Sequence, residues 1–103
     1  MSISAITSNA LSGMQAHSRS LAATANNVAN VSTPGYAHLE TSFSSHTSGG
    51  VTASVSPSAD GQNVDLANEM LDRINAEIGF KANAVVFETG ADMWDMLLTI
   101  KRD

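Results

Sequence analysis

The sequence predicts a mainly all-α protein in which two long helices, one near each end of the chain, form an antiparallel, coiled-coil-like hairpin. Three observations predict this fold. Residues 64–101 lack proline and repeat apolar residues at helical spacing, residues 1–31 carry a narrower stripe of the same kind, and both prolines lie between these segments. We therefore expect a single domain with an N-terminal helix in 1–31, a turn and connector in 32–63, and a C-terminal helix in 64–103.

The N-terminal segment is rich in alanine, serine and asparagine. Its apolar positions follow heptad spacing, apart from Ser18, at Leu11, Met14, Leu21, Ala25 and Val28. This pattern predicts a helix with a narrow apolar seam.

Residues 32–63 form a connector that holds both prolines, four of the seven glycines and many serines and threonines. Residues 36–43 (YAHLETSF) and 51–55 (VTASV) alternate as strands do, and a small β-hairpin with its tip in SSHTSGG would pair them. A disordered Ser/Thr/Gly linker fits the same composition. The sequence leaves both interpretations open.

The C-terminal helix is expected to run for about 38 residues, or roughly 57 Å. Asn63 or Asp65 can cap its start, and Lys101 with Arg102 suits the negative end of the helix dipole. Its main apolar stripe repeats every 3.67 residues or so.

A second apolar stripe on this helix includes Phe87 and Trp94, and a helix that is apolar on two sides needs more than one neighbour. We expect another chain to cover the second stripe, because exposed apolar patches mark interaction sites. The alternative is that the hairpin, or a bend at Gly79 or Gly90, covers it within the chain. The residues expected to hold the two helices together are Leu21, Val28, Ile74, Ile78 and Val85.

Three asparagines, Asn26, Asn27 and Asn30, crowd the end of the first helix, where each lowers helix propensity by up to roughly 0.7 kcal/mol relative to alanine. In one account their amides satisfy the last helix carbonyls, next to a type II turn with Pro34 and Gly35 at its centre. In the other they hydrogen-bond a neighbouring subunit and fix its register. The residues alone leave both accounts open.

Composition excludes several classes of function. A formal charge of -5 with only five lysines and arginines argues against a nucleic-acid partner. The absence of cysteine removes disulfides and zinc–thiolate sites. No apolar run reaches the roughly 18 residues that span a bilayer, and the start lacks a Sec-type signal. We therefore expect neither nucleic-acid binding nor membrane insertion.

The polar residues do not form a recognisable catalytic motif. His17, His38 and His46 are dispersed along the sequence, without the spacing typical of a metal site. The carboxylates of the last helix are spread along it, and no serine lies in a nucleophile elbow. We expect no enzyme activity, no metal and no cofactor.

Residues 12–37, SGMQAHSRSLAATANNVANVSTPGYA, resemble the N-terminal signature of bacterial flagellar rod, hook and hook-associated proteins. That signature reads Ala-Asn-Asn, an aliphatic residue, Ala-Asn, then Thr-Pro-Gly and an aromatic residue, and residues 25–30 and 33–36 match it position by position. VDLANEM (64–70), FKANA (80–84) and MLLTI (96–100) resemble the C-terminal motif of the same family. The short segment between the motifs is nearest to that of the small proximal-rod proteins.

The sequence also departs from the family pattern. Ala37 stands where many relatives carry lysine or arginine. Gly79 and Gly90 interrupt the C-terminal helix, and each lowers helix stability by about 1 kcal/mol relative to alanine. Neither departure abolishes the helix.

The resemblance implies terminal helices that polymerise as the inner tube of a helical axial structure, and export through the flagellar type III channel without a cleaved signal peptide. We accordingly expect a structural subunit of the periplasm-spanning basal-body rod. Its partners would be other copies, other rod or hook proteins and the export machinery. The alternative is a soluble helical adaptor that binds axial proteins without being incorporated. The residues expected at subunit contacts are Asn26, Asn27, Asn30, Pro34, Gly35, Tyr36, Phe87 and Trp94.

Overall fold

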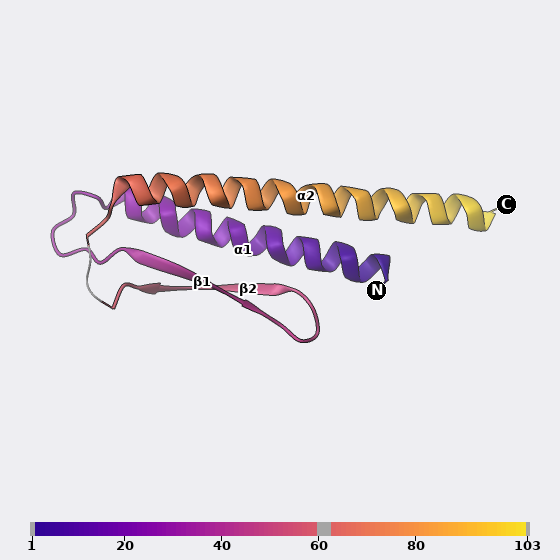
Figure 1. Ribbon diagram of the computed structural model, residues 1–103, viewed down its shortest axis with the longest axis horizontal. Helices are drawn as coiled ribbons and strands as arrows, with labels where there is room; N and C mark the ends of the chain where they lie inside the picture. The colour runs from indigo at the N-terminus through magenta and orange to yellow at the C-terminus, as the bar shows by residue number, and fades with distance from the viewer. Residues whose placement is uncertain (1, 60–62, 103) are drawn as a thin grey trace.

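The computed structural model describes residues 2–59 and 63–102 and confirms the predicted fold class. Two long helices, α1 (Ile3–Ala29) and α2 (Leu66–Arg102), lie side by side and antiparallel. Between them in the chain, strands β1 (Leu39–Ser45) and β2 (Val51–Pro57) form a two-stranded antiparallel sheet that lies along α1 (Figure 1). The molecule is elongated, with extents of 66 × 24 × 14 Å.

Both helices begin at a side-chain cap. The Ser2 hydroxyl accepts a hydrogen bond from the Ala5 backbone N–H at 3.1 Å, which satisfies one free donor in the first turn of α1. Of the two residues expected to cap α2, Asp65 does so, because its Oδ1 accepts from the Ala67 N–H at 3.0 Å. The caps therefore fix where each helix begins.

The chain leaves α1 through the predicted tight turn. The Tyr36 N–H donates to the Thr33 carbonyl at 3.3 Å, and Gly35 has a φ of +74°, as the third residue of a type II turn requires. Residues with a side chain rarely adopt this φ, whereas glycine does so without strain. The turn thus depends on Gly35 directly.

Gly35→Ala is expected to lower the free energy of unfolding by about 1 kcal/mol through backbone strain alone. A Cβ at this position would meet no atom within 4 Å, so steric overlap contributes nothing. Urea denaturation followed by circular dichroism measures the loss. Gly35→Asn is the control and should lose less, since asparagine tolerates positive φ. Equal stability of Gly35→Ala and the unchanged protein would contradict the strain argument.

The connector forms the β-hairpin rather than a disordered linker. Its register pairs Leu39 with Pro57, Thr41 with Val55 and Phe43 with Ala53, so the two alternating apolar sets share one face of the sheet. Two glycines with positive φ, Gly49 and Gly50, close the tip.

The hairpin is fastened to α1. The Val51 N–H donates to the Ser12 hydroxyl at 3.1 Å, and the Phe43 ring packs against the His17 ring with their centroids 5.2 Å apart. Ala53 is buried at the centre of the hairpin. Because a two-stranded sheet is marginal by itself, α1 is the support that stabilises it.

The helices approach each other through small residues. A Cβ added to Gly13 would lie 2.5 Å from Asn83 Oδ1, and one added to Gly79 would lie 2.5 Å from the His17 ring. At Gly90 the added atom would be 2.6 Å from Thr7 Cγ2. The glycines that interrupt α2 are therefore the places where side chains of α1 fit against its backbone.

The five residues expected between the helices are placed differently in the single chain. They are between 42 and 62% exposed: Leu21, Val28, Ile74, Ile78 and Val85. Alanine, rather than these larger side chains, supplies the buried apolar residues: Ala10, Ala16, Ala23, Ala53 and Ala76. Where backbones approach through glycine there is no room for branched side chains between them, so the large apolar residues lie along the flanks of the helix pair.

Candidate functional site

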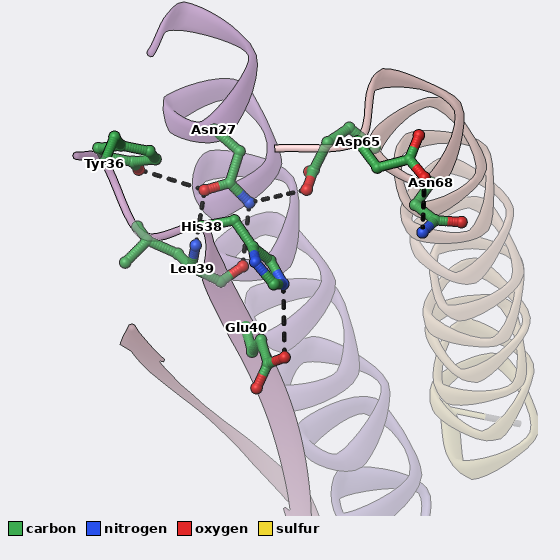
Figure 2. Close-up of polar contacts among 8 residues, drawn as sticks. Asn27, Tyr36, His38, Leu39, Glu40, Asp65 and Asn68 are labelled. Carbon is green, nitrogen blue, oxygen red and sulfur yellow. Dashed lines mark hydrogen bonds and ion pairs between the residues drawn. The ribbon is translucent and has the colours of Figure 1, made fainter. Parts of the chain in front are cut away.

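Asn27 lies at the junction of both helices, the turn and the hairpin. It is 1% exposed, and its amide uses its full capacity for hydrogen bonds. Nδ2 donates to the Leu39 carbonyl at 2.9 Å and to Glu69 Oε1 at 3.0 Å. Oδ1 accepts from the Leu39 N–H at 2.7 Å and from the Tyr36 hydroxyl at 3.2 Å. We call this cluster the asparagine node: Asn27, Tyr36, Leu39 and Glu69. Figure 2 labels the first three of these residues.

The node joins segments that are far apart in sequence. Leu39 is the first residue of β1, so the amide of Asn27 acts as a strand partner for its backbone. Glu69 lies in the first turn of α2 and is 3% exposed, which makes it a buried carboxylate that ties the two helices together. Sequence reasoning missed Glu69. The only local signal was an acidic residue in the first turn of a helix, and this is common at helix N-termini.

The other two asparagines support the end of α1 locally. Asn30 Nδ2 donates to the Asn26 carbonyl at 2.9 Å, and Asn30 Oδ1 accepts from the Thr33 hydroxyl at 3.1 Å. Asn26 Nδ2 donates to the Tyr36 hydroxyl at 3.1 Å. Within the single chain, therefore, all three asparagines hold the helix end and the turn. Asn26, Pro34 and Gly35 are exposed, whereas Asn30 and Tyr36 are half-buried.

The C-terminal end of α2 extends past the start of α1 (Figure 1). Gly90, beside Thr7, is the last buried residue of α2 that the structure describes, and residues 91–101 are all exposed. We call residues 91–101 the open end. Trp94 is 53% and Ile100 67% exposed, and the other large apolar residues there are Met93, Met96, Leu97 and Leu98. Phe87, at 38% exposure, lies just before the open end.

The chain exposes far more surface than a compact protein of its size. Its accessible area is 7104 Å², whereas a compact 10.7 kDa monomer exposes about 5500 Å². Its radius of gyration is 17.7 Å, against about 13 Å for a compact domain of this length. The excess of about 1600 Å² is roughly twice the area that one partner buries in a standard protein–protein interface. This surface is available for contacts with other chains.

The histidines take structural positions. His17 packs between Gly79 and Phe43, His38 Nε2 lies 3.4 Å from Glu40 Oε1, and His46 hydrogen-bonds Thr52. Within residues 2–59 and 63–102, no three His, Asp or Glu side chains are grouped so that they could hold a metal ion.

A groove of about 720 Å³ runs between the hairpin and the first half of α2, with α1 forming its floor. Its lining includes four carboxylates, from Glu40, Asp65, Glu69 and Asp72. Neither helix in the described part of the chain is apolar enough over a sufficient length to cross a membrane.

Comparison with known proteins finds similarity in the N-terminal part of the chain. Residues 8–36 match the family described as flagella basal body rod protein. Part of this chain is therefore similar to flagellar rod proteins. The match spans most of α1 and the turn, and so includes Asn27 and Tyr36 of the asparagine node. It confirms the resemblance of the N-terminal segment, whereas the C-terminal motifs lie outside the matched residues.

Flagellar hook proteins are also similar to part of this chain. The flagellar hook proteins FlgE of Brucella suis biovar 1, Brucella abortus biovar 1 and Brucella melitensis biotype 1 are each 42% identical to this chain over 40 residues. These residues are 39% of this chain but only 10% of each hook protein. The description of the matched family names a protein of the flagellar basal body.

Proposed function

We propose that this chain is a structural subunit of the bacterial flagellar basal-body rod and polymerises through its two terminal helices. The observation that carries the proposal is the open end, where α2 is apolar on several sides and has no helix of its own chain beside it. A helix with apolar residues all round is normally buried. In a rod, helices of neighbouring subunits would cover it.

The proposed subunit contacts fall in two regions. At the open end and just before it, Trp94 and Phe87 supply large aromatic surfaces of the kind that dominates interfaces. At the opposite end of the helix pair, the exposed Asn26, Pro34 and Gly35 are available to neighbours, together with the accessible parts of Asn30 and Tyr36. Asn27 is buried and would act indirectly, by holding the turn in place.

The partners in this proposal are other copies of the chain and other rod or hook proteins. The place of action is the periplasm-spanning rod, reached through the flagellar type III export machinery without a cleaved signal peptide. The similarity to rod proteins and the unpaired apolar surface support this assignment. The second candidate, a soluble adaptor that binds axial proteins without being incorporated, would use the same open end.

Trp94→Asp is expected to abolish recovery of the chain with detergent-extracted basal bodies, because a carboxylate cannot be buried unpaired in an apolar contact. The helix content of the purified variant should be nearly unchanged, since Trp94 is 53% exposed in the single chain. Immunoblotting of basal bodies and circular dichroism measure the two effects.

Ser8→Asp is the matched control, because it adds the same charge at a small, exposed residue of α1, outside the open end. It should leave recovery with basal bodies largely intact. If Trp94→Asp were still recovered at the level of the unchanged chain, the open end would not be the assembly contact. If the unchanged chain stayed in the soluble cytoplasmic fraction, the adaptor would replace the rod subunit as the function.

A further inference from the structure

We propose that the acidic groove between the hairpin and α2 receives the basic C-terminal tip of α2 from a second copy of this chain, so that copies join head to tail. The inference deepens the proposed function and rests on its self-association. It identifies which two surfaces meet along the long axis of the molecule. Four steps support it.

The groove is suited to a cation. Its described lining residues include Glu40, Asp65, Glu69 and Asp72 but no lysine or arginine. Two histidines also line it, and Nε2 of one of them, His38, lies 3.4 Å from Glu40 Oε1. The Glu40 side chain is 58% exposed and Asp72 is also exposed, so both are accessible from outside. Like charges that face one another across a groove repel, and a positive group between them relieves that repulsion.

Glu69 adds an independent reason for a positive partner. Its carboxylate is 97% buried in the groove wall, and Oε1 is hydrogen-bonded to Asn27. Oε2 is buried as well, and no donor of the described chain reaches it. A buried carboxylate with one uncompensated oxygen is unfavourable. A cation beside this wall would compensate the charge.

The tip of α2 carries the opposite charge. Lys101 is exposed in the last turn of the helix, and Arg102 follows it in sequence, so two basic residues there stand against one acidic residue, Asp103. The groove lies beside the first turns of α2, which contribute Glu69 and Asp72 to its lining. A head-to-tail contact would therefore bring acidic and basic helix ends together.

The length of α2 requires the contact to be intermolecular. Glu69 and Lys101 lie on one continuous helix, and their backbones are about 48 Å apart at 1.5 Å per residue. The tip cannot reach the groove of its own chain. A contact between two different surfaces is heterologous, and such contacts build a ring or an open helical array, not a twofold dimer.

The absence of cysteine allows a direct test by disulfide trapping. Asn75→Cys, in the groove lining, and Thr99→Cys, near the tip, leave every charged residue in place. The two positions are about 36 Å apart on the same helix, so no disulfide can form within one chain. The purified double variant, oxidised at a concentration where the chain associates, should give a ladder of linked oligomers on a non-reducing gel. Mixed single variants should give the cross-linked heterodimer.

Thr99→Cys combined with Ser18→Cys is the matched control, because Ser18 is exposed on α1 but does not line the groove. Equal cross-linking of the control and the groove pair would overturn the proposal. Association without any groove-to-tip cross-link would also overturn it while leaving the rod function standing. A chain that remained monomeric at every concentration would instead contradict the proposed self-association.

Charge reversal supplies a second readout. Lys101→Glu and Asp72→Lys should each weaken association by roughly three- to tenfold in sedimentation equilibrium, and the double variant should recover most of the loss. The association constant of the unchanged chain should fall as salt is raised. Arg19→Glu, an equal charge change on α1, should have little effect. No recovery in the double variant would exclude a direct pairing of these two surfaces.

Discussion

Asn27→Leu is expected to lower the free energy of unfolding by about 3 kcal/mol, because it leaves one buried and three partly buried polar groups without this partner. Leucine has nearly the shape of asparagine, so the loss reports hydrogen bonds more than packing. The groups left behind are the N–H and carbonyl of Leu39, the Glu69 carboxylate and the Tyr36 hydroxyl. Urea denaturation followed by circular dichroism measures the change.

Hydrogen exchange should locate the damage. In Asn27→Leu the Leu39 amide should lose protection, because its partner is the Asn27 side chain. Asn26→Leu is the matched control, since Asn26 is exposed and its side chain contacts only the turn and the end of α1. The free energy of unfolding of that variant should fall by less than about 1 kcal/mol. Equal losses in the two variants would mean that the asparagine node does not hold the hairpin and helices together.

Gly79→Leu is expected to destabilise the helix pair by about 2 kcal/mol through overpacking. A Cβ at position 79 would lie 2.5 Å from the His17 ring, which is itself held against Phe43. Removing a glycine from a helix interior raises helix propensity by about 1 kcal/mol, which offsets part of the loss. Urea denaturation measures the net effect.

Two comparisons make the Gly79 result specific. Ala82→Leu places the same side chain at an exposed position of α2 and should change stability by less than about 0.5 kcal/mol. Combining Gly79→Leu with His17→Ala opens space at the contact, so the two changes together should be less harmful than their sum. Strictly additive losses would show that position 79 and His17 do not press on each other.

The close contact between α1 and α2 explains why so much apolar surface faces outward. Glycine and alanine bring the helices together, which leaves Leu21, Ile74 and Val85 along the flanks and the open end uncovered. In an isolated protein this arrangement wastes hydrophobic stabilisation, since each large side chain contributes about 1.5 to 3 kcal/mol only when it is buried. In an assembly the same side chains would be buried in the interfaces between subunits.

The sequence by itself determined the elements whose cause is local. Proline-free apolar periodicity predicted both helices, Asp65 was recognisable as a cap, and Pro34 with Gly35 predicted the turn. The alternation in residues 36–43 and 51–55 predicted the strands, but a linker fitted the same residues until the packing of the hairpin on α1 decided the question. These features follow from backbone preferences of neighbouring residues.

Only the tertiary structure decided which side of each helix faces the other and what the buried polar groups do. Periodicity marks every apolar stripe but does not show that the helices meet at Gly13, Gly79 and Gly90, because the choice depends on how closely two backbones can approach. Asn27 donates a hydrogen bond to Glu69, which is 42 positions away in the sequence, so no local pattern could reveal the pair. Local chemistry thus specified the elements, and contacts between distant residues specified their arrangement.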